Sequence, residues 1–356
     1  MPSGLMEAMT DVIRVDPVTP DPAALLRAAE CLRRGGLVAF PTETVYGLGV
    51  HALDRAAVRR LFEAKGRPAN DPLIVHVDAV DRIYALVADV PDETRALAAR
   101  FWPGPLTLVL LRSSRVPDEV TAGLNTVAIR VPAHPVAHAL LTAAGIPVAA
   151  PSANLFSRPS PTRASHVLDD LAGRIDLVVD GGATPVGVES TVLDLSGEAP
   201  TILRPGAVSI DMLREILPRV ERRSAEAPSS GAMKSPGLLE RHYSPRAPLT
   251  VYDGSDGVTR LVRDACTWIA SGQRLGIMVA DEDRDALVDV EHHGATIAYL
   301  GSESDLATVA SRLYAVIREL DASGVDRILV RGLAGEDGLA VAIRDRLSRA
   351  SVRSQS

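Results

Sequence analysis

Two stretches on either side of one helix decide the fold and point to a binding site: AFPTETVYGLGV at residues 39–50 and KGRPANDPLIVHV at residues 65–77. The first stretch is rich in hydroxyls and glycines, which lets main-chain N–H groups come close to a ligand. The second places Lys65 and Arg67 two residues apart, beside a proline and a carboxamide. This mixture predicts a pocket that holds a polyanion together with a small polar substrate.

Lysine is rare in the chain, which makes its positions informative. Only two lysines, Lys65 and Lys234, occur among the 38 lysines and arginines. A compact ammonium on a thin stem reaches between phosphates where a planar guanidinium does not fit. We therefore interpret Lys65 as a phosphate contact; the alternative is a cation that happens to stand at a helix end, where the dipole favours it.

The composition indicates a globular protein without a strong charge field. The 356 residues suffice for two or three domains, 46% of them are hydrophobic, and the formal net charge is −7. This balance argues against tight nonspecific binding of nucleic acid. Cys31 and Cys266 have no CxxC partner, which excludes a zinc ribbon or a redox dithiol. Because cysteines are few and neither a signal peptide nor a bilayer-spanning run is recognisable, we expect a cytoplasmic protein that contacts no membrane.

The hydrophobic periodicity divides the chain into three parts. Residues 1–217 alternate buried strands with helices, and the pattern predicts a twisted, mostly mixed α/β sheet in which Asp54 caps the start of one helix and Gly66 ends it. Residues 218–247 are rich in Pro, Ser, Ala and Arg without any period, which indicates a linker. Residues 248–356 again alternate strands with helices and predict a small parallel sheet with helices on its faces.

Four polar clusters lie at strand ends or in loops, where α/β folds build ligand sites. They are Thr42-Glu43-Thr44 with Tyr46 and Gly47, Lys65-Gly66-Arg67, Pro151-Ser152-Ala153-Asn154 with Arg158 and Ser160, and Glu189-Ser190-Thr191 with Arg204 and Gly206. Taken singly, each has a plain structural alternative, such as a turn or a helix end. No metal-ligand spacing, GxSxG elbow or P-loop is present. We therefore expect phosphate to be bound by cations and main chain, with no metal held by the protein itself.

Nine motifs follow one another along residues 20–217, and together they resemble a known family. They are PTETVYGLG, KGRP, PLIVH, FWPGPLTLVL, TVAIRVP, PSAN, SRPSPT, ESTVLDL and ILRPG. In this order they closely resemble the YrdC-like threonylcarbamoyl-AMP synthases, and the linker ending in RHYSP with its α/β tail resembles the long form of that family. The resemblance implies a YrdC-like catalytic domain with a twisted mixed sheet, followed by a small Rossmann-like parallel α/β domain.

The resemblance also implies an activity and its partners. Such enzymes condense L-threonine, bicarbonate or carbon dioxide, and ATP into threonylcarbamoyl-AMP and pyrophosphate, which is a nucleotidyl transfer. The product passes to a separate transferase that modifies the adenosine next to the tRNA anticodon, and a weak tRNA contact by this chain is a further expectation. ATP is thus expected as a substrate, with Mg²⁺ carried by its phosphates.

Carried over position by position, the resemblance implies two sets of site residues. The threonine pocket is expected from Thr44, His76, Arg130, the main chain of Ala150, and Ser190. The ATP contacts are expected from Lys65, Arg67, Asp71, Thr126, Ser152, Asn154, Ser160, Arg204 and, closing over the nucleotide from the linker, Tyr243. Among these, the cluster expected over the phosphates, and expected to be catalytic, is Lys65, Arg67, Ser152 and Asn154.

Two departures and two rival functions accompany these assignments. Residues 70–73 read NDPL, so a carboxylate, Asp71, stands near the expected triphosphate and requires magnesium or a hydrogen-bond donor. The linker reads SPGLLERHY, with Leu239 and Glu240 where the family commonly has Lys and Tyr.

One rival function is that of a carbamoyltransferase of the hydrogenase-maturation type, which the absence of cysteine-rich zinc motifs disfavours. The other is a noncatalytic RNA-binding module, which the acidic balance disfavours.

Overall fold

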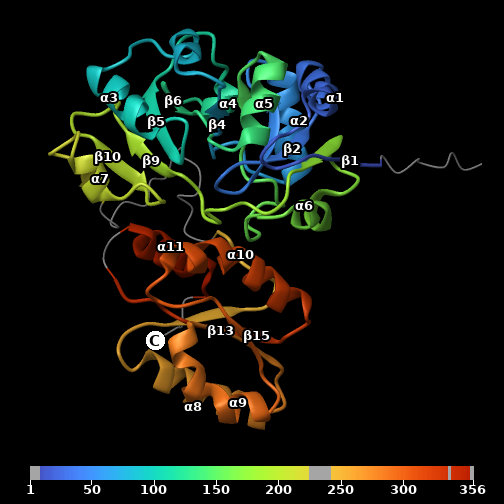
Figure 1. Cartoon of the computed structure of the whole chain (residues 1–356), viewed down its shortest axis with the longest axis vertical. Helices are drawn as coiled ribbons and strands as arrows, with labels where there is room; N and C mark the ends of the chain where they lie inside the picture. Colours follow the sequence, from blue (N-terminus) through green and yellow to red (C-terminus); the bar gives the residue numbers. More distant parts are fainter. Residues whose placement is uncertain (1–8, 224–241, 336–337, 353–356) are drawn as a thin grey trace, which may run out of the picture.

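The computed structural model describes residues 9–223, 242–335 and 338–352, and these form two α/β domains (Figure 1). The segment predicted as a linker, 218–247, joins the two domains, and its residues 224–241 lie outside the described ranges. The departures at Leu239 and Glu240 therefore lie outside them as well. Within the described ranges, no helix is long and apolar enough to cross a membrane.

The first domain is built on a mixed sheet of eleven strands, counted over the described residues. In spatial order the strands are β1 (Asp11–Arg14), β8 (Leu177–Asp180), β2 (Val38–Pro41), β3 (Tyr46–His51), β7 (Val148–Ala149), β4 (Ile74–His76), β6 (Thr126–Arg130), β5 (Leu106–Leu111), β9 (Thr191–Asp194), β10 (Thr201–Arg204) and β11 (Glu221–Arg222). The sheet contains both parallel pairs, such as β4–β6, and antiparallel pairs, such as β3–β7, which confirms the predicted mixed sheet. β11 pairs with β10, so the sheet continues beyond the expected domain end at residue 217.

Helices of the first domain flank this sheet, and their ends follow local sequence signals. They are α1 (Pro22–Arg33), α2 (Arg55–Lys65), α3 (Asp92–Phe101), α4 (Asp118–Thr121), α5 (Pro135–Ala144), α6 (Ala164–Leu171) and α7 (Ile210–Arg214), with a 3₁₀ turn η1 (Val80–Ala85). The Asp54 side chain accepts hydrogen bonds from the first N–H groups of α2, and Gly66 ends the helix at φ 62°. Both predicted helix ends are confirmed. This helix delivers Lys65 and Arg67 to the loop that leads into β4.

The second domain has the parallel sheet that its periodicity predicts. Among the described residues its strands run in the order β12 (Leu249–Tyr252), β15 (Arg327–Arg331), β13 (Leu275–Val279) and β14 (Thr296–Tyr299), with every pair parallel. The helices are α8 (Gly257–Ala270), α9 (Val288–His292), α10 (Leu306–Ala322) and α11 (Gly338–Ala350), with a 3₁₀ turn η2 (Asp281–Leu287). Figure 1 shows α10 and α11 on the side of this sheet that faces the first domain.

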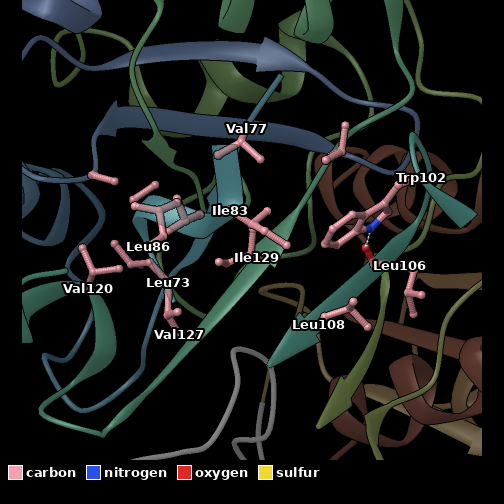
Figure 2. Packing of buried hydrophobic residues seen from close by; sticks show 14 of the residues in the cluster. Leu73, Val77, Ile83, Leu86, Trp102, Leu106, Leu108, Val120, Val127 and Ile129 are labelled. Carbon is pink, nitrogen blue, oxygen red and sulfur yellow. Dashed lines mark hydrogen bonds between the residues drawn. The ribbon is translucent and has the colours of Figure 1, made fainter. Parts of the chain in front are cut away.

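Two hydrophobic clusters determine where the site forms. The larger fills the first domain around β4, β5 and β6, and Figure 2 shows Leu73, Ile129 and Leu108 packed within it. The indole of Trp102, in the same cluster, donates a 2.7 Å hydrogen bond to the Leu106 carbonyl, also drawn in Figure 2. A second cluster belongs mainly to α10, α11 and the second sheet, yet it includes two valines of the first domain, at positions 45 and 188. The two domains therefore share one buried core at their boundary.

Candidate active site

One pocket gathers residues from the ends of several strands of the first domain and from the end of the linker. Nine of the predicted site residues line it: Thr44, Arg67, His76, Arg130, Ala150, Ser152, Ser190, Arg204 and Tyr243. The other lining residues are Thr42, Val45, Gly47, Ile74, Pro151, Glu189 and His242. His76, Arg130 and Arg204 are the last residues of β4, β6 and β10. The sheet topology thus brings together polar residues that are far apart in sequence, as α/β folds do at strand ends.

Arg130 is a buried cation held by the loop that follows β2. Its Nη1 donates a 2.9 Å hydrogen bond to the Thr44 hydroxyl, and its Nε donates to the Gly104 carbonyl at 3.2 Å. Its Nη2 lies 2.7 Å from the Glu43 carboxylate. Thr44 Oγ1 in turn lies 2.8 Å from Thr42 Oγ1, so the hydroxyls form a short chain. Because this buried guanidinium pairs with only one carboxylate of the described residues, another carboxylate can take the place of Glu43 on it.

His76 lies beside Arg130 on the neighbouring strand and is neutral at physiological pH. Its Nδ1 is 3.2 Å from the Ile74 carbonyl, and its side chain is almost fully buried. Burial, reinforced by the charge of Arg130, lowers the pKa of His76 to about 3. A neutral imidazole orients a polar ligand by hydrogen bonding and adds no charge to the pocket.

Ser190 and Arg204 form the opposite wall. The Ser190 hydroxyl lies 2.8 Å from Thr107 Oγ1 and accepts a 3.1 Å hydrogen bond from Arg204 Nη2. Arg204 Nε also donates to the Ser190 carbonyl at 3.1 Å. The turn after Arg204 needs glycine at position 206, because a Cβ there would stand 2.3 Å from the Thr191 nitrogen. The RPG sequence therefore brings a guanidinium directly onto the segment that carries Ser190.

Lys65 ends α2, as its sequence predicts, and its ammonium contacts a neighbouring loop. Its ammonium is buried outside the pocket lining and donates to the main-chain carbonyls of Ser152, at 2.6 Å, and Asn154. The Asn154 amide likewise donates to the carbonyls of Leu155 and Arg158. In this structure both residues hold the loop that presents Ser152, and the direct phosphate contact expected of them stays a prediction.

Arg67 lines the pocket and supplies the hydrogen-bond donor that the Asp71 carboxylate requires. Its Nη2 lies 2.9 Å from the Asp71 carboxylate, and Nε and Nη2 also donate to the carbonyls of Asp71 and Pro72. Asp71 is fully buried, and burial raises its pKa. The donor that the NDPL sequence calls for is therefore Arg67, and the carboxylate orients this guanidinium from behind.

Two other predicted ATP contacts also lie outside the pocket lining. Thr126 begins β6, at the opposite end of that strand from Arg130. A strand rises about 3.3 Å per residue, so the two residues are roughly 13 Å apart. Ser160 donates a 2.5 Å hydrogen bond to the Glu189 carboxylate, behind the wall. A direct contact between either residue and ATP remains a prediction.

Linker residues His242 and Tyr243 complete the pocket, and both are buried. The two rings meet edge to face with centroids 4.1 Å apart, and the Tyr243 ring lies 5.5 Å from the Tyr314 ring. Burial, followed by the negative charge of Glu189, raises the pKa of Tyr243 to about 12. The end of the linker is thus part of the site and is packed onto the second domain.

Sequence reasoning gave no role to two lining residues that carry chemistry: Glu189, which it named only as a member of a polar cluster, and His242. Both stood next to a predicted residue, in the ESTV and RHYSP motifs, and this adjacency was the available signal. Burial raises the pKa of Glu189, but the guanidiniums of Arg346 and Arg204 and the hydrogen bond from Ser160 outweigh it and lower the pKa to about 2. Glu189 is therefore an anion in the wall of the pocket.

The fold and the pocket together define an α/β protein whose pocket is lined by cations and hydroxyls at strand ends. Residues 30–206 match the protein family described as "Telomere recombination", and residues 208–352 match "Threonylcarbamoyl-AMP synthase, C-terminal domain". The chain is 42% identical to the threonylcarbamoyl-AMP synthase of Pyrococcus abyssi, over 91% of this chain and 93% of that relative. It is 40% identical to the Bacillus subtilis relative of the same name, over 94% of each.

A solved structure extends this similarity to three dimensions. The crystal structure of P. abyssi Sua5 complexed with L-threonine matches 96% of this chain and 98% of its own, with a TM-score of 0.89 and 40% identity. The similarity in sequence and the similarity in structure therefore both extend over the two domains. The chain belongs to the threonylcarbamoyl-AMP synthase family.

The neutral state of His76 predicts a specific acid sensitivity. An unfolded histidine has a pKa of about 6.5, so between this value and the folded value of about 3 the unfolded state binds more protons, and stability falls as the pH drops. His76→Gln should flatten the dependence of the unfolding free energy on pH by about 1.4 kcal/mol per pH unit between pH 6 and 4. Urea denaturation across this range measures the slope.

The exposed His138 on α5 provides the control, because His138→Gln removes an imidazole without opening the core. In the His138→Gln variant, the slope of unfolding free energy against pH should equal that of the unaltered protein. A His76→Gln variant with an unaltered slope would contradict the neutral, buried imidazole.

Proposed function

We propose that this chain condenses L-threonine, bicarbonate or carbon dioxide, and ATP into threonylcarbamoyl-AMP and pyrophosphate, acting as a nucleotidyltransferase. One observation above all supports this: Arg130, Thr44 and Ser190 border the same pocket as Arg67 and Arg204. A partner for a carboxylate and partners for a hydroxyl thus lie beside two cations suited to phosphate. The activity is also the one for which the family is named.

Threonine is proposed to bind with its carboxylate on Arg130, where it takes over the place of the Glu43 carboxylate. The guanidinium presents two parallel donors, so the pairing can be bidentate. The hydroxyls of Thr44 and Ser190, the neutral His76 and the main chain of Ala150 then orient the amine and the side-chain hydroxyl. The P. abyssi relative was crystallised with L-threonine, which supports a threonine site in this fold.

ATP is proposed to place its phosphates against Arg67, Ser152 and Arg204, with Tyr243 bordering the nucleotide. Lys65 and Asn154 serve this site by holding the loop of Ser152, and Asp71 serves it by orienting Arg67. Mg²⁺ is proposed to enter bound to the triphosphate. Direct contacts of ATP with Lys65, Asn154, Asp71, Thr126 and Ser160 belong to the same proposal.

The proposed reaction has two steps. The free α-amine attacks the carbon of carbon dioxide, a C–N bond forms as one C–O π bond breaks, and loss of a proton from nitrogen leaves a carbamate. With bicarbonate as the source, its hydroxyl group leaves together with that proton as water. A carbamate oxygen then attacks the α-phosphorus, a P–O bond forms, and pyrophosphate leaves with the electron pair of the broken bond. The protein positions the reactants and stabilises charge on phosphorus.

The product is a mixed anhydride that water destroys, so shielding is part of the function. His242 and Tyr243 border the pocket, and we propose that they exclude water from it. The product is proposed to pass to a separate transferase that modifies tRNA, with a weak tRNA contact by this chain. Because tRNA is used in the cytoplasm, we propose that compartment for the reaction.

A pyrophosphate-release assay tests the proposed function. The purified chain should release pyrophosphate from ATP only when threonine and bicarbonate are both supplied, and mass spectrometry should find threonylcarbamoyl-AMP in equal amount. A carbamoyltransferase would require carbamoyl phosphate, and a noncatalytic RNA-binding module would release nothing. Pyrophosphate release that is unchanged without threonine would contradict the proposal.

The threonine pocket predicts strong selection against valine. Valine has the shape of threonine but lacks the hydroxyl, so it cannot make the hydrogen bond that threonine is proposed to make with the buried Thr44 and Ser190 hydroxyls. The ratio of kcat/KM for threonine over valine should be about 100 or more, and serine, which lacks only a methyl group, should be rejected less strongly. Ser190→Ala should lower the threonine-to-valine ratio about tenfold, since one partner is gone. An unaltered ratio in this variant would remove Ser190 from hydroxyl recognition.

A further inference from the structure

Glu189 is a charged residue in the pocket wall to which the proposed reaction assigns no role. It directly precedes Ser190, and only 6% of its surface is exposed. Its Oε1 accepts hydrogen bonds from Ser160 Oγ at 2.5 Å and from the Tyr314 hydroxyl at 3.2 Å. Its Oε2 accepts from the same Tyr314 hydroxyl at 3.0 Å and from Arg346 Nε at 2.7 Å. Two of these three donors come from the second domain.

Arg346 on α11 contacts three separate parts of the pocket wall at once. Its Nε binds Glu189, its Nη2 donates to the Pro205 carbonyl at 2.9 Å, and its guanidinium carbon lies 5.6 Å from the centre of the Tyr243 ring. Its Nη1 donates to the neighbouring Asp345 at 2.6 Å. The side chain is fully buried, so each of these contacts is shielded from water.

The backbone of the same wall lies directly against α10. A Cβ added to Gly187, which has φ 77°, would stand 2.3 Å from the Ala310 carbonyl oxygen. Val188 belongs to the hydrophobic cluster of α10 and α11, together with Leu313 and Tyr314. The segment that carries Glu189 and Ser190 is therefore enclosed by the second domain, on the side where Figure 1 shows α10 and α11.

We propose that Arg346 is a positioning residue of the active site: it neutralises Glu189 and holds the wall around Ser190 and Pro205 so that the pocket accepts a triphosphate. The inference rests on the proposed function. A carboxylate without its counter-ion in this wall would repel the phosphates of ATP, and burial would strengthen the repulsion. Threonine carries no net charge, so its binding should depend much less on Arg346.

Arg346 compensates the negative charge of Glu189 more strongly than Arg204 does. The Arg204 guanidinium also lies close enough to lower the pKa of Glu189, but Arg346 lowers it more. Arg346 also donates a hydrogen bond directly to Glu189 and comes from the other domain. Removing one member of a buried ion pair leaves an uncompensated buried charge, which costs more than removing both members. The test therefore compares a single variant with a double variant.

The test compares steady-state kinetics of full-length variants. Arg346→Gln keeps a hydrogen-bond donor but removes the charge, and we expect KM for ATP to rise about tenfold or more while KM for threonine changes less than about threefold. The double variant Glu189→Gln/Arg346→Gln removes both charges and should return KM for ATP to within about threefold of the original. Arg344→Gln, two residues away on α11, makes the same change of net charge and should behave like the unaltered protein.

The outcomes separate this inference from the proposed function. If the unaltered chain releases pyrophosphate with threonine and Arg346→Gln has an unaltered KM for ATP, the inference fails while the function stands. If the double variant is as impaired as the single one, Arg346 acts through shape and charge neutralisation is wrong. Should Arg346→Gln not fold, Arg346→Lys and the double variant provide the comparison. Both should keep KM for ATP within about threefold, and a larger rise in both would overturn the inference.

Discussion

The buried ion pair between Glu189 and Arg346 is the contact on which the arrangement of pocket and domains depends. Desolvating two charges is costly, so such a pair contributes little net stability by itself. What it provides is geometry, because the carboxylate accepts from Ser160 in one domain and from Tyr314 and Arg346 in the other. A shift of one domain against the other would leave a buried charge unpaired. The position of the second domain is therefore coupled to the shape of the pocket wall.

The same logic extends to the other buried charges around the pocket. Arg130 pairs with Glu43, Arg67 pairs with Asp71, and the Lys65 ammonium is bound by main-chain carbonyls. In each case the charge is held in place before any substrate arrives, which reduces the reorganisation needed during the reaction. The cations differ in where they lie relative to the pocket. Arg130 and Arg67 face the pocket, whereas Lys65 secures the loop behind it.

Local signals in the sequence predict much of this fold. The caps of α2 at Asp54 and Gly66 and the alternation of strands and helices in the second domain depend on neighbouring residues, and the structure confirms them. The family resemblance, and no local pattern, pointed to His76 and Arg130, and the structure shows that both end neighbouring strands, where α/β folds place ligands.

The partners of the buried charges were not predictable in the same way. Glu189 is separated from Tyr314 by 125 positions and from Arg346 by 157, and both partners lie in a different domain. No local pattern encodes such a contact, since it depends on how α10 and α11 dock. The place of Lys65 is similar: its position at a helix end was clear, but its carbonyl partners come from a loop 87 and 89 residues away.

If both domains build one substrate site, binding should slow hydrogen–deuterium exchange in both of them. Exchange is followed by mass spectrometry with and without threonine together with a non-hydrolysable ATP analogue. We expect slower exchange on binding in the loops of residues 42–47 and 186–191, and also in residues 242–247 and in helices α10 and α11, because the second domain packs against the wall of the pocket. Protection confined to the first domain, with α10 and α11 unaffected, would contradict a site built by both domains.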